Sequence, residues 1–257
     1  VVVRGNRLQN IGYIGIVAEY NALVEKNVID NPTAILNDGG GIAFDFANGM
    51  IIQDNIVRNI TGSLESSAPN NDNYLKICNG IYFGNNGVVN TTVRRNTVYN
   101  CLGDGILADH TMGSAGNKVQ DNVLFNNTVQ LALSDFSNSN GPSAVPPYYV
   151  ANYDDVYSGN TMYSMDKDQL CMLQTGSYSA QPVDFGTYSG NHYFNPYNEL
   201  SIEVVNPFAG APEFYSLERW QSELGEDAGS TRSPMRLNAY ATVQQLVELP
   251  GPGVEAV

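Results

Sequence analysis

The sequence predicts an all-β protein, a right-handed, single-stranded parallel β-helix (a solenoid) closed by a short C-terminal capping helix. Two observations lead to this prediction: an asparagine motif that recurs along most of the chain, and short apolar alternations between asparagine and glycine turns. A third, an amphipathic segment near the C-terminus, predicts the cap.

The motif is Asn-x-apolar-x-Asn, in which the second Asn follows four residues after the first. The first Asn occurs seven times, at Asn6, Asn27, Asn55, Asn96, Asn122, Asn160 and Asn191. The second Asn is present in six copies, and Ser164 replaces it in the other. Successive copies are 21 to 41 residues apart, which is too variable for a rigid helical repeat but suits a solenoid whose turns accept insertions.

Stacking of coils explains why the motif uses Asn. Equivalent residues of stacked coils lie about 4.7–4.9 Å apart, so an Asn at the same turn of every coil can donate its amide to the next. Asn also tolerates the left-handed backbone of a tight bend. We therefore expect a structural ladder rather than a ligand site.

The predicted cap contains Leu217, Trp220 and Leu224 at helical spacing, between an N-cap Ser216 and a terminating Gly225. A cap is expected because an open solenoid edge invites aggregation.

Residues 1–237 form the predicted β-helix with its cap, and residues 238–257 form a terminal strand or a linker tail. The chain opens at Val1 in the middle of a coil, so we expect additional N-terminal coils or a further domain before it.

Composition excludes several classes of function. The net charge is −14 and only 15% of residues are charged, so the surface is acidic and otherwise neutral-polar. Such a surface repels nucleic acid and anionic membranes, and no apolar run reaches membrane-spanning length. We expect no nucleic-acid partner and no membrane partner.

Strand alternation predicts which side chains face outward. If Ile16, Ile42, Ile81, Ile106 and Leu131 point into the core, the second residue after each also points inward and the residues between face out. The outward residues form two columns. The first is Val17, Ala43, Tyr82, Leu107 and Ala132, and the second is Glu19, Asp45, Gly84, Asp109 and Ser134.

The second column predicts a catalytic site at Glu19, Asp45 and Asp109, because carboxylates stacked one above another repel and do not stabilise a fold. Glu19 and Asp45 would lie about 5 Å apart, and Asp45 and Asp109 about 10 Å apart. Carboxyl separations of about 5–5.5 Å are typical of retaining glycosidases and about 6.5–9.5 Å of inverting ones. Gly84 would leave room for a sugar ring.

Four neighbouring side chains are expected to bind substrate. The tyrosines can stack on a sugar face, the histidine can orient Asp109 or share its proton, and the aspartate precedes a triple glycine that leaves room beside it. These residues are Asp38, Tyr20, Tyr82 and His110. Two other interpretations stay open: the carboxylates are ordinary solvated surface groups, or they bind Ca²⁺. No cofactor is required in the catalytic interpretation.

The asparagine repeats and two further segments resemble the pectate-lyase-like superfamily of secreted right-handed β-helix proteins. The segments are Asp38-Gly39-Gly40-Gly41-Ile42 and Tyr215-Ser216-Leu217-Glu218-Arg219-Trp220, and the resemblance spans roughly residues 1–230. It implies a secreted or cell-surface, carbohydrate-active protein with a polysaccharide or oligosaccharide partner. It leaves the activity open, because the superfamily includes lyases, glycoside hydrolases, epimerases, esterases and phage tailspikes.

Superfamily members that act on uronates present Lys or Arg beside a calcium-binding acidic group, and the outward column here has no basic residue. The Asp-Pro-His-Asp element of alginate epimerases is absent, as are the Gly-Asp-Asp and Gly-His-Gly elements of polygalacturonases. We therefore expect a glycoside hydrolase that acts on a neutral polysaccharide. The alternatives are a non-catalytic glycan-binding or adhesin β-helix and a calcium-dependent polysaccharide lyase.

Overall fold

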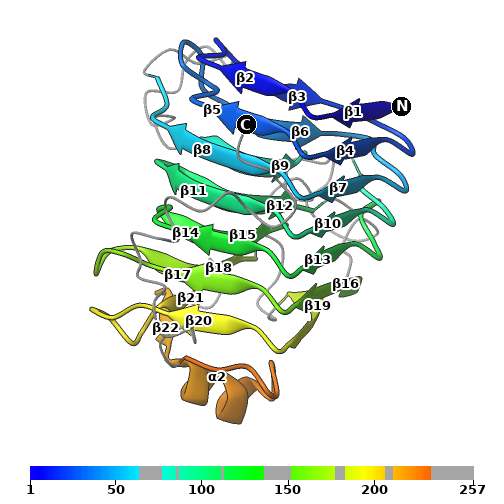
Figure 1. Ribbon diagram of the computed structural model, residues 1–257. Coiled ribbons are helices and arrows are strands. Elements are labelled where there is room, and N and C mark those ends of the chain that lie inside the picture. Colours follow the sequence, from blue (N-terminus) through cyan, green and yellow to red (C-terminus); the bar gives the residue numbers. More distant parts are fainter. Residues whose placement is uncertain are drawn as a thin grey trace, which may run out of the picture.

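The computed structural model describes residues 1–63, 77–84, 87–110, 113–135, 152–176, 183–205 and 211–232. Within them the chain winds through stacked coils, and successive coils add strands to three parallel sheets (Figure 1). This is the predicted parallel β-helix. The predicted tail at 238–257 lies outside the described residues.

Three sheets run along the solenoid, and we call them sheets A, B and C. Sheet A contains, in order, β1 (Val2–Arg4), β4 (Leu23–Glu25), β7 (Ile51–Gln53), β10 (Thr92–Arg94), β13 (Lys118–Gln120), β16 (Asn152–Ser158) and β19 (Asp184–Ser189). Sheet B contains β2 (Arg7–Gln9), β5 (Val28–Asp30), β8 (Ile56–Ile60), β11 (Thr97–Cys101), β14 (Val123–Phe125), β17 (Thr161–Tyr163) and β20 (His192–Phe194). Sheet C contains β3 (Ile16–Val17), β6 (Gly39–Phe44), β9 (Cys78–Phe83), β12 (Asp104–Asp109), β15 (Val129–Ser134), β18 (Leu170–Thr175), β21 (Ile202–Val205) and the antiparallel β22 (Glu213–Tyr215).

The predicted asparagine ladder runs through the described coils from Asn6 to Asn191. Each first Asn donates both its backbone N–H and its Nδ2 to the Oδ1 of the Asn in the next coil, at 2.9–3.1 Å. Asn191, the last, donates its backbone N–H to Ser230 Oγ at 2.6 Å and its Nδ2 to Asp227 Oδ1 at 3.3 Å. Residues after the cap therefore complete the final rung.

The left-handed backbone does not fall at the first Asn. It falls one residue earlier, with φ of 52–68° at Gly5, Lys26, Asp54, Arg95, Asp121, Gly159 and Gly190. The reason is that the first Asn leads directly into a strand of sheet B. The second Asn of the motif takes the left-handed conformation in five of its six copies, with φ of 53–58° at Asn10, Asn31, Asn59, Asn100 and Asn126.

The core follows the predicted alternation in sheet C. Ile16, Ile42, Ile81, Ile106 and Leu131 are in register from strand to strand, and each is at most 7% exposed. Apolar side chains thus fill the inside of the coil, and the outer face of sheet C carries the residues between them.

The helix α2 (Leu217–Leu224) lies beyond the last coil as the predicted cap (Figure 1). Ser216 Oγ accepts the N–H of Arg219 at 3.3 Å, and Gly225 ends the helix with φ of 71°. Trp220, 1% exposed, packs edge-on against Tyr188 and Tyr215. No helix in the described ranges is long and apolar enough to cross a bilayer.

Candidate functional site

A pocket of about 230 Å³ opens on the outer face of sheet C at its first three strands. Its acidic lining is Glu19, Asp38 and Asp45, and its aromatic lining includes Tyr13 and Tyr82. Glu19 follows β3, Asp45 follows β6 and Tyr82 belongs to β9, so three neighbouring coils contribute. We call this the acidic pocket.

Four of the seven predicted site residues line the acidic pocket: Glu19, Asp38, Asp45 and Tyr82. The register explains why they meet. Val17 pairs with Ala43, and Ala43 pairs with Tyr82, so equal steps along the strands reach neighbouring rungs.

Gly84 has no side chain and so leaves space for Asp45, and the room expected above this glycine is taken by the carboxylate itself. A Cβ added to Gly84 would lie 1.6 Å from Asp45 Oδ1. That oxygen is buried and has no hydrogen-bond partner among the described residues. The glycine is therefore needed for the carboxylate rather than for a sugar ring.

Two tyrosines frame the carboxylates. Tyr13 donates its hydroxyl to the backbone carbonyl of Asp38 at 2.6 Å, which ties the turn before β6 to the turn before β3. Burial raises the pKa of Tyr82, and the neighbouring carboxylates of Asp109, Asp45 and Asp38 raise it further. Tyr82 therefore stays protonated and can donate a hydrogen bond.

Asp109 lies in the predicted register, paired with Ser134 on the next strand of sheet C. Its strand is paired with the strand of Tyr82 through Leu107, two residues earlier, and its carboxylate contributes to the raised pKa of Tyr82. It is only 6% exposed, however, and does not line the acidic pocket. Alternation predicts the face of a residue but not its exposure, and a catalytic role for Asp109 stays a prediction.

The expectation that His110 works beside Asp109 at this surface is wrong. Its ring is 2% exposed and lies inside the coil, as alternation from Asp109 requires. The Nδ1 atom is 2.9 Å from the carbonyl oxygen of Ser134, and Nε2 is 3.1 Å from Asp155 Oδ2. Tyr153 packs against the ring at a centroid distance of 4.4 Å.

Tyr20 also lies apart from the acidic pocket. It is 56% exposed, has a left-handed backbone with φ of 36°, and does not line the cavity. Its predicted stacking on a substrate has no support in this geometry.

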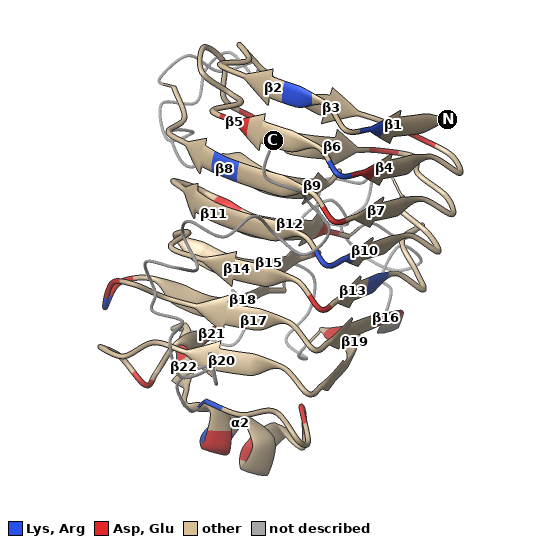
Figure 2. Ribbon diagram, in the orientation of Figure 1, with Lys and Arg blue, Asp and Glu red and all other residues tan. Residues whose placement is uncertain are grey.

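The electrostatics of the acidic pocket are one-sided. Its lining carries three carboxylates and no Lys or Arg. Figure 2 shows Lys and Arg on strands of sheets A and B, such as β1, β8 and β10, and also on turns and on α2, whereas the described strands of sheet C contain none. Among the described residues, no three His, Cys, Asp or Glu side chains come close enough to hold a metal ion.

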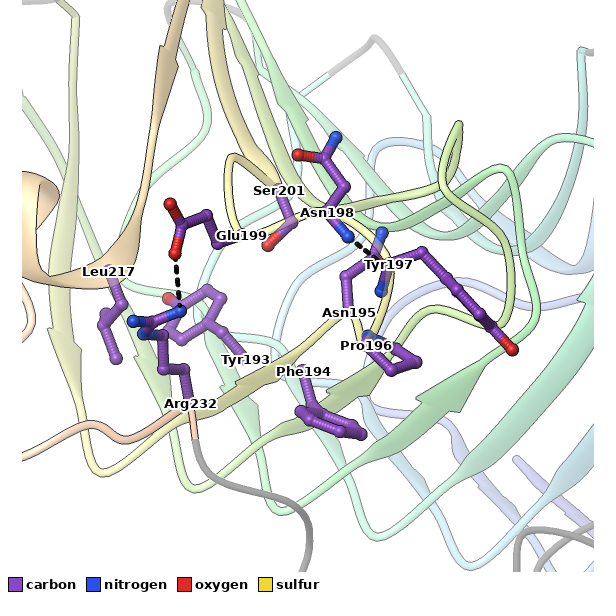
Figure 3. A pocket seen from close by; sticks show the side chains of 10 residues that line it. All are labelled: Tyr193, Phe194, Asn195, Pro196, Tyr197, Asn198, Glu199, Ser201, Leu217 and Arg232. Atoms are coloured by element: carbon purple, nitrogen blue, oxygen red, sulfur yellow. Dashed lines mark hydrogen bonds and ion pairs between the residues drawn. The ribbon is translucent and has the colours of Figure 1, made fainter.

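A second cavity, of about 380 Å³, lies at the other end of the solenoid between the last coil and the cap (Figure 3). Sequence periodicity does not predict it, because only Tyr193 and Phe194 come from a strand, β20, and the rest of its lining comes from a turn, from Leu217 of α2 and from Arg232. The available signal was the turn sequence Asn195-Pro196-Tyr197-Asn198, which places an aromatic residue among turn formers.

Comparisons with known proteins bear on the fold. A family model described as the right handed beta helix region matches residues 1–143. The chain is similar in structure to the A-module of the Azotobacter vinelandii mannuronan C-5 epimerase AlgE4, with 14% identity and a TM-score of 0.43 over 91% of this chain and 58% of that one. It is also similar to the T265N mutant of the periplasmic alginate epimerase AlgG, with 14% identity and a TM-score of 0.35 over 80% of this chain and 46% of that one.

The chain therefore spans about half the length of these two structures. No curated protein sequence matches it. The family model covers more than half of the chain, and the matched residues include the first five Asn residues of the ladder. This chain therefore belongs to the right-handed β-helix family.

Proposed function

We propose that this β-helix protein is carbohydrate-active and hydrolyses a glycosidic bond of a neutral polysaccharide in the acidic pocket. The observation that carries the proposal is that Glu19 and Asp45 line one cavity from neighbouring coils. Their strands are in register at Val17 and Ala43, so the two backbones lie about 5 Å apart at the carboxylates. That spacing suits the two carboxyl groups of a retaining glycosidase.

In this mechanism one carboxyl group of the Glu19 and Asp45 pair protonates the leaving oxygen while the other attacks the anomeric carbon. The first, now a carboxylate, then activates the water that releases the sugar. Tyr82 donates a hydrogen bond to the bound sugar, because its raised pKa keeps the phenol protonated. A pairing of Asp45 with Asp109 across two rungs would favour inversion instead.

The charge of the acidic pocket supports a neutral substrate. Three carboxylates with no Lys or Arg in the lining repel the carboxylates of a uronic acid chain. We also propose that the protein acts outside the cell or at the cell surface, a location that suits a polysaccharide substrate. Calcium at the outward carboxylates stays an alternative, in which the pocket would serve a calcium-dependent lyase.

The test is cleavage of neutral hexasaccharides and of uronic oligosaccharides, alginate among them, by the wild-type protein and two variants. Glu19→Gln and Asp45→Asn should each lower the rate of neutral-glycan hydrolysis by about 100-fold or more, with unchanged circular dichroism. The matched control is Asp168→Asn, because the Asp168 side chain is 78% exposed on the turn between β17 and β18. It should leave the rate unchanged.

Three outcomes would overturn the proposal. Full activity in both variants would exclude the Glu19 and Asp45 pair. Glycan binding without cleavage of any substrate would indicate a non-catalytic glycan-binding or adhesin β-helix. Calcium-dependent cleavage with an unsaturated product would indicate a lyase.

A further inference from the structure

The cavity in Figure 3 is built by the turn that joins β20 to β21 and by the cap. Phe194 of β20 lies on one side, and Tyr193 of β20, Leu217 of α2 and Arg232 lie on another (Figure 3). At about 380 Å³ it is larger than the acidic pocket. We call it the cap pocket.

The turn beside the cap pocket is held rigid by Asn195. Its Oδ1 accepts the backbone N–H groups of Tyr197 and Asn198, at 2.9 and 3.1 Å. Its Nδ2 donates to the carbonyl oxygens of Asp166 and Gln169, at 3.1 and 3.0 Å. A turn fixed in this way loses little conformational freedom when a ligand binds.

One side of the cap pocket is aromatic. Phe194 contacts Tyr163 of the preceding coil at a centroid distance of 5.2 Å, so the aromatic surface extends one rung beyond the cavity. Tyr197 is 68% exposed. It lines the cavity from the turn that follows Phe194.

The opposite side of the cap pocket is polar. Arg232 forms an ion pair with Glu199 at 3.2 Å (Figure 3) and a second one with Glu218 of α2 at 2.5 Å. A carboxylate that accepts and a guanidinium that donates can together bind neighbouring hydroxyl groups, while aromatic faces pack against the apolar face of a sugar ring. In contrast to the acidic pocket, the lining has one acidic and one basic residue, so it favours a neutral ligand.

We propose that the cap pocket is a second saccharide-binding site, which holds a neutral oligosaccharide against Tyr197, Phe194 and the Glu199 and Arg232 pair. It is separated from the acidic pocket by four rungs of sheet C, from β9 to β21, or about 19 Å. The binding requires no hydrolysis and therefore goes beyond the function proposed above.

The test is isothermal titration calorimetry with neutral hexasaccharides of β-linked glucose, β-linked xylose, β-linked mannose and α-linked glucose. At least one should bind the wild-type protein, and Tyr197→Ala should weaken that binding by about fivefold or more, as expected for the loss of an aromatic stacking partner. The matched control is Phe214→Ala, since Phe214 is an exposed aromatic residue that lines neither pocket. It should bind as the wild-type protein does.

Two results would overturn this proposal. One is the absence of binding by all four hexasaccharides at millimolar concentration. The other is binding that Tyr197→Ala leaves intact and Asp45→Asn abolishes, which would place all binding in the acidic pocket. Loss of hydrolysis in Asp45→Asn with intact binding bears on the hydrolase alone, so the two proposals fail separately.

Discussion

Replacement of Asn96 by alanine tests how much the ladder stabilises the fold. Asn96 is fully buried, and its Oδ1 accepts both the backbone N–H and the Nδ2 of Asn55. Its Nδ2 donates to Asn122 Oδ1 and to the carbonyl oxygen of Ile52. In Asn96→Ala the backbone N–H of Asn55 loses its partner inside the protein.

The expected cost can be worked from these contacts. An orphaned buried donor costs about 1–3 kcal/mol, and each of the other three lost hydrogen bonds about 0.5–1.5 kcal/mol. We therefore expect Asn96→Ala to lower the free energy of unfolding by roughly 2.5–7.5 kcal/mol, measured by urea denaturation followed by far-UV circular dichroism.

Asn6→Ala is the control for the ladder prediction, because Asn6 is exposed in the first coil. Its backbone N–H keeps Asn27 Oδ1 as partner, and only the side-chain amide bonds are lost. The expected cost is about 1 kcal/mol or less. Equal losses in the two variants, or a loss below about 1 kcal/mol in Asn96→Ala, would refute the reasoning.

Three further predictions follow from the site, the cap and the buried tyrosines. Gly84→Ala should displace the Asp45 carboxylate and lower the rate of hydrolysis at least about tenfold. The control, Gly113→Ala, should leave the rate unchanged, because its new Cβ would meet nothing nearer than 3.7 Å. Equal rates in the two variants would contradict the role of Gly84. Trp220→Ala should cost about 3–5 kcal/mol in urea denaturation, and a cost below about 1 kcal/mol would mean that the cap is dispensable. Burial raises the pKa of Tyr157 and of other buried tyrosines above the ordinary value of 10.0. The stability that these tyrosines contribute is therefore complete below pH 10 and is lost as the pH rises above 10. The absorbance of their tyrosinates should appear together with the loss of circular dichroism, and full tyrosinate absorbance at a lower pH, in protein that is still folded, would contradict the prediction.

The fold was predictable because its signals are local and repeated. The Asn of the ladder marks each coil, and the alternation in sheet C assigns Ile42 and Ile81 to the core and Tyr82 to the outer face. A period of two leaves no freedom in this choice, since a slip of one residue would turn every apolar side chain outward.

The site was only partly predictable, because exposure depends on what covers a face and turns have no period. Glu19 and Asp45 meet as expected from register. Asp109 lies in the predicted register but is buried. His110 contacts Asp155, which is 45 residues away in sequence. Asp155 lies at a register irregularity of β16, between Asn152 and Asp155, and no sequence motif predicts it.

The most direct test of the central claim is the configuration of the first product, followed by ¹H NMR as a neutral hexasaccharide is cleaved. If Glu19 and Asp45 act as a pair one rung apart, the newly released reducing end keeps the anomeric configuration of the bond that was broken. Release of the inverted anomer would contradict this pair and favour carboxylates two rungs apart, and the absence of any cleavage would contradict a hydrolytic acidic pocket.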